Sequence, residues 1–111
     1  MTYAKLKKRA EFSRVFQLGR TYGDRYMVLF VLSSKTAQTR VGFASKRSVG
    51  TAVRRNRVRR RLRSLYALYA DKIVPCGDLI FLGKKSMIEA PWEELKRSMA
   101  RVLRQAGCLE G

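Results

Sequence analysis

The stretch from residue 46 to residue 63, KRSVGTAVRRNRVRRRLR, most constrains how this chain can fold, because seven of its last ten residues are arginine. On a helix that turns by about 100° per residue, one narrow stripe of this stretch and its continuation is apolar. That stripe consists of Val58, Leu62, Leu65 and Tyr69. Thr51 precedes the arginines and is suited to cap the helix, since its hydroxyl can accept from a free backbone N–H. The stretch therefore predicts a helix with one side in a core and an arginine surface on the other.

The polar side of this expected helix is not uniform. Asn56, Arg57, Arg60 and Arg63 project opposite the apolar stripe, with Arg59 and Arg61 on its flanks. Arg54 and Arg55 lie in the first turn and project nearer to the stripe. The helical periodicity leaves open which of these last two side chains faces a ligand.

The charge of the whole chain indicates a polyanionic partner. Lys plus Arg number 25 and Asp plus Glu number 8, so the formal net charge is +17. A small domain stays soluble with a net charge of roughly 2–8, so solubility alone does not require this excess. Clustered Lys and Arg that neutralise phosphates give salt-sensitive binding to nucleic acid. We therefore expect a nucleic-acid-binding protein.

Length and composition predict one globular domain over residues 1–111, with a basic lead-in at residues 1–9 that is mobile until it meets an anion. No apolar run approaches the roughly 20 residues of a membrane span. The first residues, MTYAKLKKRAEF, lack the apolar segment of a secretory signal. These features predict a cytoplasmic location.

No set of residues in the sequence indicates catalysis. The chain has no histidine, so a Cys/His zinc site and histidine-based catalysis are excluded, and Cys76 and Cys108 are expected to be reduced thiols. The eight acidic residues are dispersed and form no cluster typical of a metal-dependent nuclease. Glycines 42 and 50 lack the Gly-Lys-Ser/Thr ending of a P-loop. We expect the polypeptide itself to break no bond.

The first apolar pattern predicts a short amphipathic helix. Phe12, Val15 and Phe16 recur at helical spacing over residues 10–18, and Gly19 is placed to end that helix in a left-handed turn. Two interpretations of Phe12 and Phe16 stay open. They are either core residues or part of an open face on which unpaired bases stack.

The other elements predict a small mixed sheet. Residues 25–32 (RYMVLFVL) and 40–45 (RVGFAS) form two strands, expected to pair as an antiparallel hairpin around the polar turn at 33–39. Residues 79–82 (LIFL) form a buried strand, so strand, arginine helix and strand make a crossover with parallel pairing. A last helix starts at Pro91 and ends at Gly107. The result is a two-layer α+β domain.

These residues together resemble a known family, the bacterial ribonuclease P protein component. The resemblance rests on Lys46-Arg47, Val49-Gly50, Ala52-Val53, Arg55-Asn56-Arg57, Arg59-Arg60 and Arg63, in that order and spacing. The usual Lys-Arg pair of the family motif stands here as Arg59-Arg60, which keeps the charge. The likeness extends to Glu11-Phe12, Val15-Phe16, Arg40-Val41-Gly42 and the last helix, so it covers nearly the whole chain.

The resemblance implies more than the spacing does. It implies the element order αβββαβα, similar to a domain of ribosomal protein S5, with a left-handed βαβ crossover that general rules would not have predicted. It also implies the protein subunit of an endonuclease that removes the 5′ leader of precursor tRNA. In that enzyme the catalytic RNA and its magnesium ions carry the reaction, and no obligatory protein partner, organic cofactor or membrane is involved.

Carried over residue by residue, the resemblance implies two contact surfaces. The catalytic RNA would be contacted by Lys46, Arg47, Arg55, Asn56, Arg57, Arg59, Arg60 and Arg63. The leader cleft would be lined by Phe12, Phe16 and Phe30, where Phe30 stands at a position often occupied by tyrosine. Two alternatives are a ribosomal or other structural RNA-binding protein, and a protein-only nuclease that the dispersed acids disfavour.

Overall fold

The computed structural model describes residues 3–33 and 38–109. The expected order of helices and strands is confirmed, with one short strand added in front of it. The elements are β1 (Ala4–Lys5), α1 (Arg9–Leu18), β2 (Arg20–Gly23), β3 (Met27–Leu32), β4 (Arg40–Ser45), α2 (Ala52–Tyr69), β5 (Asp78–Gly83) and α3 (Trp92–Gln105). Single 3-10 turns η1 (Arg47–Val49), η2 (Ala70–Lys72) and η3 (Lys85–Met87) follow β4, α2 and β5.

The five strands form one mixed sheet in the order β1-β4-β5-β3-β2. The antiparallel hairpin expected between residues 25–32 and 40–45 is wrong, because β5 lies between these two strands. β5 pairs antiparallel with β3 and parallel with β4, for example Leu29 with Phe81 and Val41 with Leu79. The continuous apolar run of β5 explains this position, since a strand that is buried on both faces belongs in the centre of a sheet.

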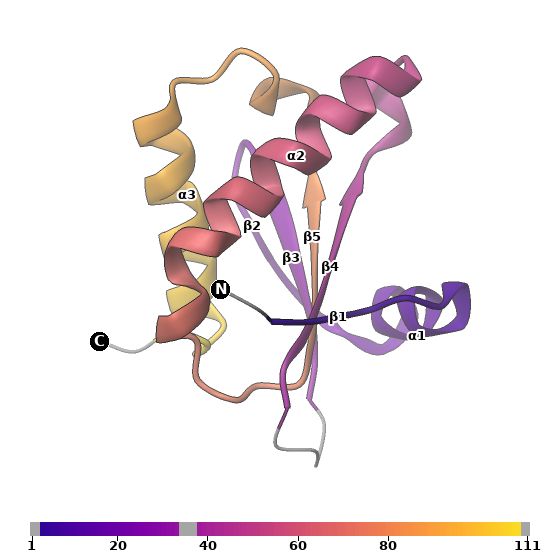
Figure 1. The fold of residues 1–111 in the computed structure, drawn as a ribbon, viewed down its shortest axis with the longest axis vertical. Helices are drawn as coiled ribbons and strands as arrows, with labels where there is room; N and C mark the ends of the chain where they lie inside the picture. The colour runs from indigo at the N-terminus through magenta and orange to yellow at the C-terminus, as the bar shows by residue number, and fades with distance from the viewer. Residues whose placement is uncertain (1–2, 34–37, 110–111) are drawn as a thin grey trace.

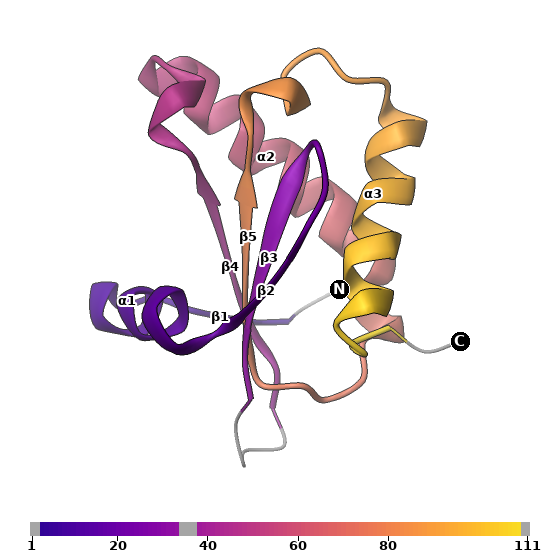
Figure 2. The same ribbon diagram turned by 180° about the vertical axis from the view of Figure 1, so that it is seen from behind.

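The helices lie on both faces of the sheet (Figures 1 and 2). α2 and α3 cover one face, where Leu79 and Phe81 of β5 join the main core with residues of both helices. α1 lies against the other face, where Ile80 packs with Val15 and with the half-buried Phe30. The sheet and the α2–α3 layer are the two layers expected from the sequence, and α1 adds a partial cover behind them.

The crossover from β4 through α2 to β5 is left-handed, as the resemblance implied. In Figure 1 both strands run upward, α2 passes in front of the sheet, and β5 lies to the left of β4. Nearly all parallel crossovers have the opposite hand, so this connection departs from the general rule. In Figure 1 no other element lies in front of the outer side of α2.

α2 begins and packs much as its pattern predicted. Thr51 caps it by accepting a hydrogen bond from the Arg54 backbone N–H at 3.3 Å. Val58, Leu62 and Leu65 are fully buried, whereas Tyr69 is half-buried and Tyr66 takes the fourth buried position. The helix lies very close to β5, since a Cβ added at Gly83 would stand 2.2 Å from Cγ1 of Val58.

The expected end of the first helix is wrong in its detail. Gly19 has φ −74° and ψ 154°, an extended conformation and not a left-handed one, because β2 starts at the next residue. A glycine is still suited to this place, since a Cβ would lie 2.6 Å from the carbonyl oxygen of Val15. In contrast, Gly107 ends the last helix with φ +74°, as expected.

Part of the basic lead-in, residues 4–6, is attached to the sheet. β1 pairs in parallel with β4, and Leu6 is buried with its N–H donating to the carbonyl of Val41 at 2.9 Å. The expected turn at 33–39 falls partly on residues 34–37, which lie outside the described residues. The two cysteines are free thiols, and the Cys108 thiol donates to the carbonyl of Ala106 at 3.8 Å. None of the helices described is long and apolar enough to cross a membrane.

Candidate RNA-binding surface

The outer side of α2 presents most of the cations that the sequence assigned to it. Asn56, Arg57, Arg60 and Arg63 are exposed, and Arg55 and Arg59 are half-buried. A guanidinium N–H of Arg59 donates to the side-chain oxygen of Asn56, one turn earlier on the helix. Asn56 therefore orients an arginine of this surface in addition to presenting its own amide.

The segment between β4 and α2 brings Lys46 and Arg47 to the start of the same surface. The backbone N–H of Lys46 donates to the carbonyl of Gly83 at 3.0 Å, which fixes the end of β4 against the end of β5. Val49 is fully buried and anchors η1, while Gly50 reverses the chain with φ +113°. Lys46 and Arg47 are exposed beside this anchored turn.

Arg61 does not belong to the exposed surface. Its guanidinium donates to the carbonyls of Met87, Ile88 and Ala90, at 2.6, 3.0 and 2.9 Å. It also lies 5.9 Å from the ring centroid of Trp92. Burial lowers the pKa of Arg61, and the neighbouring positive charge of Arg57 adds to this effect. The sequence placed Arg61 on a flank but gave no signal for this role, because its partners lie 26 to 29 residues away.

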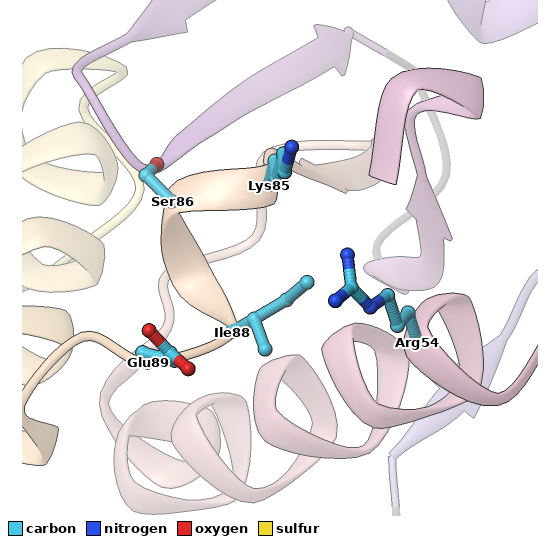
Figure 3. Close-up of a pocket in the computed structure, with 5 residues that line it drawn as sticks. All are labelled: Arg54, Lys85, Ser86, Ile88 and Glu89. Carbon is cyan, nitrogen blue, oxygen red and sulfur yellow. The ribbon is translucent and has the colours of Figure 1, made fainter. Parts of the chain in front are cut away.

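The structure distinguishes the two arginines of the first turn. Arg54 is exposed and Arg55 is half-buried. Figure 3 shows the Arg54 guanidinium directed across a pocket toward Ile88, on the flank of α2 that also carries Arg61. Each of the two therefore has solvent on one side, and Arg54 faces the segment after β5.

The three phenylalanines lie together on the face of the sheet opposite α2. Phe16 and Phe30 form an edge-to-face pair with ring centroids 4.9 Å apart. Phe12 and Phe30 pack against the buried Leu6, Val15 and Ile80, whereas Phe16 is 37% exposed. The cluster is therefore anchored in a small core and open to solvent at Phe16.

Gly42 sets the position of Phe12 on this face. A Cβ at residue 42 would lie 2.6 Å from two atoms of the Phe12 ring, so the ring lies directly on the backbone of β4. The close approach explains why a glycine stands in the middle of a strand, where it is otherwise unfavourable.

The most buried carboxylates are engaged in ion pairs. Arg40 joins Glu11 at 2.5 Å and Asp78 at 2.8 Å, which ties α1 to β4 and β5. Asp24 accepts from the Ser98 hydroxyl at 2.5 Å and pairs with Arg101 at 3.0 Å. Within residues 3–33 and 38–109, no three Asp, Glu, Cys or His residues gather where they could hold a metal ion.

Comparison with known proteins matches this arrangement to one family. The sequence model of the family Ribonuclease P matches residues 2–107 of this chain. The chain belongs to the ribonuclease P protein family. Members of this family are the protein components of ribonuclease P, the ribonucleoprotein endoribonuclease that processes the 5′ end of tRNA.

Individual members of the ribonuclease P protein family are similar over nearly the whole chain. The ribonuclease P protein component of Natranaerobius thermophilus is 37% identical over 105 residues, covering 95% of this chain and 91% of that protein. The component from Chloroflexus aggregans is 39% identical over 106 residues, covering 95% of this chain and 78% of that protein.

Solved structures of the family share the fold. The RNase P protein of Staphylococcus aureus superposes with a TM-score of 0.82 and 23% identity, covering 98% of this chain and all of that one. The RNase P protein of Thermotoga maritima superposes with a TM-score of 0.79 and 22% identity, covering 96% of this chain and 98% of that one. The family model and the sequence relatives favour the ribonuclease P protein over the ribosomal alternative.

Proposed function

We propose that this protein binds the catalytic RNA of ribonuclease P through α2 and the 5′ leader of precursor tRNA through the Phe12–Phe16–Phe30 face, in the cytoplasm. The observation that carries the proposal is the exposed row of cations on α2. Arg57, Arg60 and Arg63 have no ion-pair partner among the described residues, so their charge is free for a ligand.

The chemistry of α2 suits an RNA backbone. A guanidinium is planar and always charged, and its N–H groups hydrogen-bond two phosphate oxygens in a fork. α2 extends over 18 residues, about 27 Å at 1.5 Å per residue, so its arginines span several phosphates along a strand. Because the contacts are to phosphate, we expect affinity to fall steeply with salt.

The Phe12–Phe16–Phe30 face suits a single strand of varied sequence. Every base has a π-face, so stacking on phenylalanine tolerates many leaders. Phe30 has no hydroxyl, which leaves packing and stacking as its only contacts. This face and the outer side of α2 lie on opposite sides of the sheet, so one molecule can engage both RNAs at once.

Catalysis in this proposal belongs to the RNA subunit. Magnesium ions, held mainly by that RNA, supply the Lewis-acid chemistry of phosphodiester hydrolysis. Among the described residues no three possible ligands gather to hold such an ion, and Glu11, Asp24 and Asp78 are already bound to arginines. The protein's own part is to bind and orient the two RNAs and to offset their charge near the cleavage site.

The decisive experiment is cleavage of precursor tRNA at low magnesium by a bacterial ribonuclease P RNA, with and without this protein. We expect cleavage at the mature 5′ end only when both components are present. Protein alone serves as the control for a protein-only nuclease. Unchanged activity of the RNA on adding the protein would overturn the proposal.

The surface itself is tested by replacing Arg57 and Arg60 together with alanine. Because both side chains are exposed, the folding free energy should stay within about 0.5 kcal/mol of the parent. Affinity for the catalytic RNA should fall, and the slope of log affinity against log salt should flatten by about 0.7–1 per lost phosphate contact. A filter-binding titration over a range of salt measures both quantities. If the variant and the parent had the same affinity and the same salt dependence, the outer side of α2 would not be the surface that binds the catalytic RNA.

A further inference from the structure

A pocket of about 200 Å³ lies beside the first turn of α2, outside the set of residues that the family motif contributes. Arg54 from α2 forms one side of it, and the segment that follows β5 forms the other. Figure 3 shows the side chains around its opening. The lining residues are Arg54, Lys85, Ser86, Ile88 and Glu89.

The parallel pairing of β4 and β5 brings the two sides of the pocket together. Both strands end at the same edge of the sheet, where η1 and α2 follow β4 and η3 follows β5. Further hydrogen bonds fix this edge, since the Lys84 N–H donates to the carbonyl of Tyr26 at 2.9 Å and the Ser86 hydroxyl donates to that of Arg25 at 2.6 Å. The pocket is therefore part of the fold and not a gap between loose loops.

Two cations at this pocket carry unbalanced charge. Neither Arg54 nor Lys85 forms an ion pair within the described residues, in contrast to Arg40, Lys96 and Arg101. In Figure 3 the side chain of Ile88 lies between the Arg54 guanidinium and the Glu89 carboxylate. The acid therefore leaves the Arg54 charge free, and both cations are exposed to solvent.

Arg61 gives this pocket a rigid wall. Its guanidinium holds the carbonyls of Met87, Ile88 and Ala90, so the chain that carries Ile88 and Glu89 is tied to α2 itself. Met87 is fully buried and anchors the same segment in the core. The two cationic side chains are thus attached to backbones whose separation is fixed before any ligand arrives, which reduces the entropy lost on binding.

From these observations we propose that Arg54 and Lys85 together bind one phosphodiester group of the RNA that lies on α2. This inference rests on the proposed function and extends it to a residue of another element. Arg54 and Arg57 are three residues apart and neighbours on the helix surface, so the pocket continues the arginine row toward η3. A guanidinium fork and a lysine point charge are a suitable pair for a single anionic group.

The phosphate belongs to the catalytic RNA and not to the leader, because of where the pocket lies. It opens on the side of the sheet that α2 covers, while Phe12, Phe16 and Phe30 lie on the opposite side. A leader on the phenylalanine face would have to pass round the edge of the sheet to reach Lys85. The RNA that follows α2 needs only to extend past its first turn.

The test is binding of a bacterial ribonuclease P RNA over a range of salt concentrations by the whole protein and four variants. These are Arg54→Gln, Lys85→Gln, the double variant, and Arg97→Gln, an exposed arginine of α3 outside the proposed surfaces. We expect each pocket substitution to weaken binding about fivefold at low salt. Because both residues bind the same phosphate, the slope of log affinity against log salt concentration should flatten by about 0.7–1 in the double variant, and not by twice that amount. Arg97→Gln should match the parent protein.

The possible failures are distinguishable. A fifth variant, Arg57→Gln, tests the arginine row itself. If the parent binds the RNA and Arg57→Gln weakens this binding, but the pocket variants behave like Arg97→Gln, the pocket assignment is overturned and the proposed function stands. If the parent protein does not bind the RNA, both the pocket assignment and the proposed function are overturned. If the pocket variants bind the catalytic RNA normally but lower the affinity of the assembled enzyme for precursor tRNA, the phosphate is the leader's, which overturns the assignment to the catalytic RNA. Circular dichroism and melting temperature verify that each variant is folded.

Discussion

At the scale of single residues, Arg60 and Arg61 are neighbours in sequence with opposite surroundings. Arg60 is exposed, whereas Arg61 gives its guanidinium to three backbone carbonyls and packs near Trp92. A count of arginines therefore overstates the charge available to RNA. Among the hydrogen bonds of the described residues, those of Arg61 are the ones from this run that hold two elements of the protein together.

Replacing Arg61 with methionine should destabilise the fold rather than the RNA contact. The change leaves the carbonyls of Met87, Ile88 and Ala90 without their donor, so we expect a loss of about 1.5–3 kcal/mol in unfolding free energy. Urea denaturation measures it. The matched control is Arg60→Met, which should change stability by less than about 0.5 kcal/mol and instead weaken RNA binding. Equal stability of the two variants would contradict the structural role of Arg61.

The contribution of Glu11 to the stability of the protein depends on pH. The backbone N–H groups of Lys8 and Lys7 donate to its carboxylate, and with the added contribution of Arg40 they lower the pKa of Glu11 to about 2. A carboxyl whose pKa is depressed on folding stabilises the protein above its ordinary pKa, near 4.5, and this contribution is lost as pH falls toward 2. Glu11→Gln should therefore be less stable than the parent at pH 6, with the difference vanishing near pH 2.

That comparison is made by denaturation at a series of pH values. Glu89→Gln serves as the control, because its side chain is exposed and forms no ion pair among those described. A stability difference between parent and Glu11→Gln that stays constant from pH 6 to pH 2 would rule out this linkage.

At the scale of elements, the sequence was most informative where the pattern was local. The buried stripe of α2, its Thr51 cap, the glycine that ends α3 and the parallel crossover could all be predicted, because each depends on spacing within one segment or on one connection. The pairing of β3 with β4 was wrong, because the strand between them comes 33 residues after β4 ends, from Ser45 to Asp78. Only the apolar character of β5 on both faces indicated a central place.

The candidate site shows the same division. The exposure of Arg57, Arg60 and Arg63 follows from helical periodicity, and so does the burial of Val58 and Leu62. The contacts of Arg61 and the pocket beside Arg54 depend on residues 85–90, which no local pattern joins to α2. Sequence periodicity defines the faces of an element, but which segment packs on each flank is decided by the tertiary fold.

The contact between α1 and the sheet can be disturbed without touching α2. Gly42→Ala would place a Cβ 2.6 Å from the Phe12 ring, so the ring must move away from β4. We expect weaker binding of the precursor-tRNA leader, measured as the affinity of the assembled enzyme for substrates with and without a leader. Affinity for the catalytic RNA should be unchanged.

The complementary variant is Arg57→Gln, which should weaken binding of the catalytic RNA and leave Phe12 in place. If Gly42→Ala altered the affinity for the catalytic RNA as much as Arg57→Gln does, the division into two separate surfaces would be wrong. If leader binding survived the displacement of Phe12, the phenylalanine face would not be the leader site.

At the scale of the whole molecule, the net positive charge lowers the stability of the folded state. Twenty-five Lys and Arg against eight Asp and Glu leave a net charge of +17 on 111 residues, and its self-repulsion destabilises the compact state. Raising salt from about 0.05 M to 0.5 M shortens the screening length to a few ångströms and should raise the melting temperature. Differential scanning calorimetry measures the change. A melting temperature that falls with salt would mean that the few surface ion pairs outweigh the repulsion.

The central place of β5 in the sheet also affects how the protein folds during its synthesis. During synthesis, β3, β4 and the whole of α2 are made before residues 78–83. Neither β3 nor β4 then has its inner neighbour, and Val58 and Leu62 have no strand to pack against. A nascent chain thus carries its full arginine run before it has a sheet on which to display it. The ordered surface arrives late and together with the completed fold, so a prematurely ended chain keeps the charge but loses the shape that gives it a specific target.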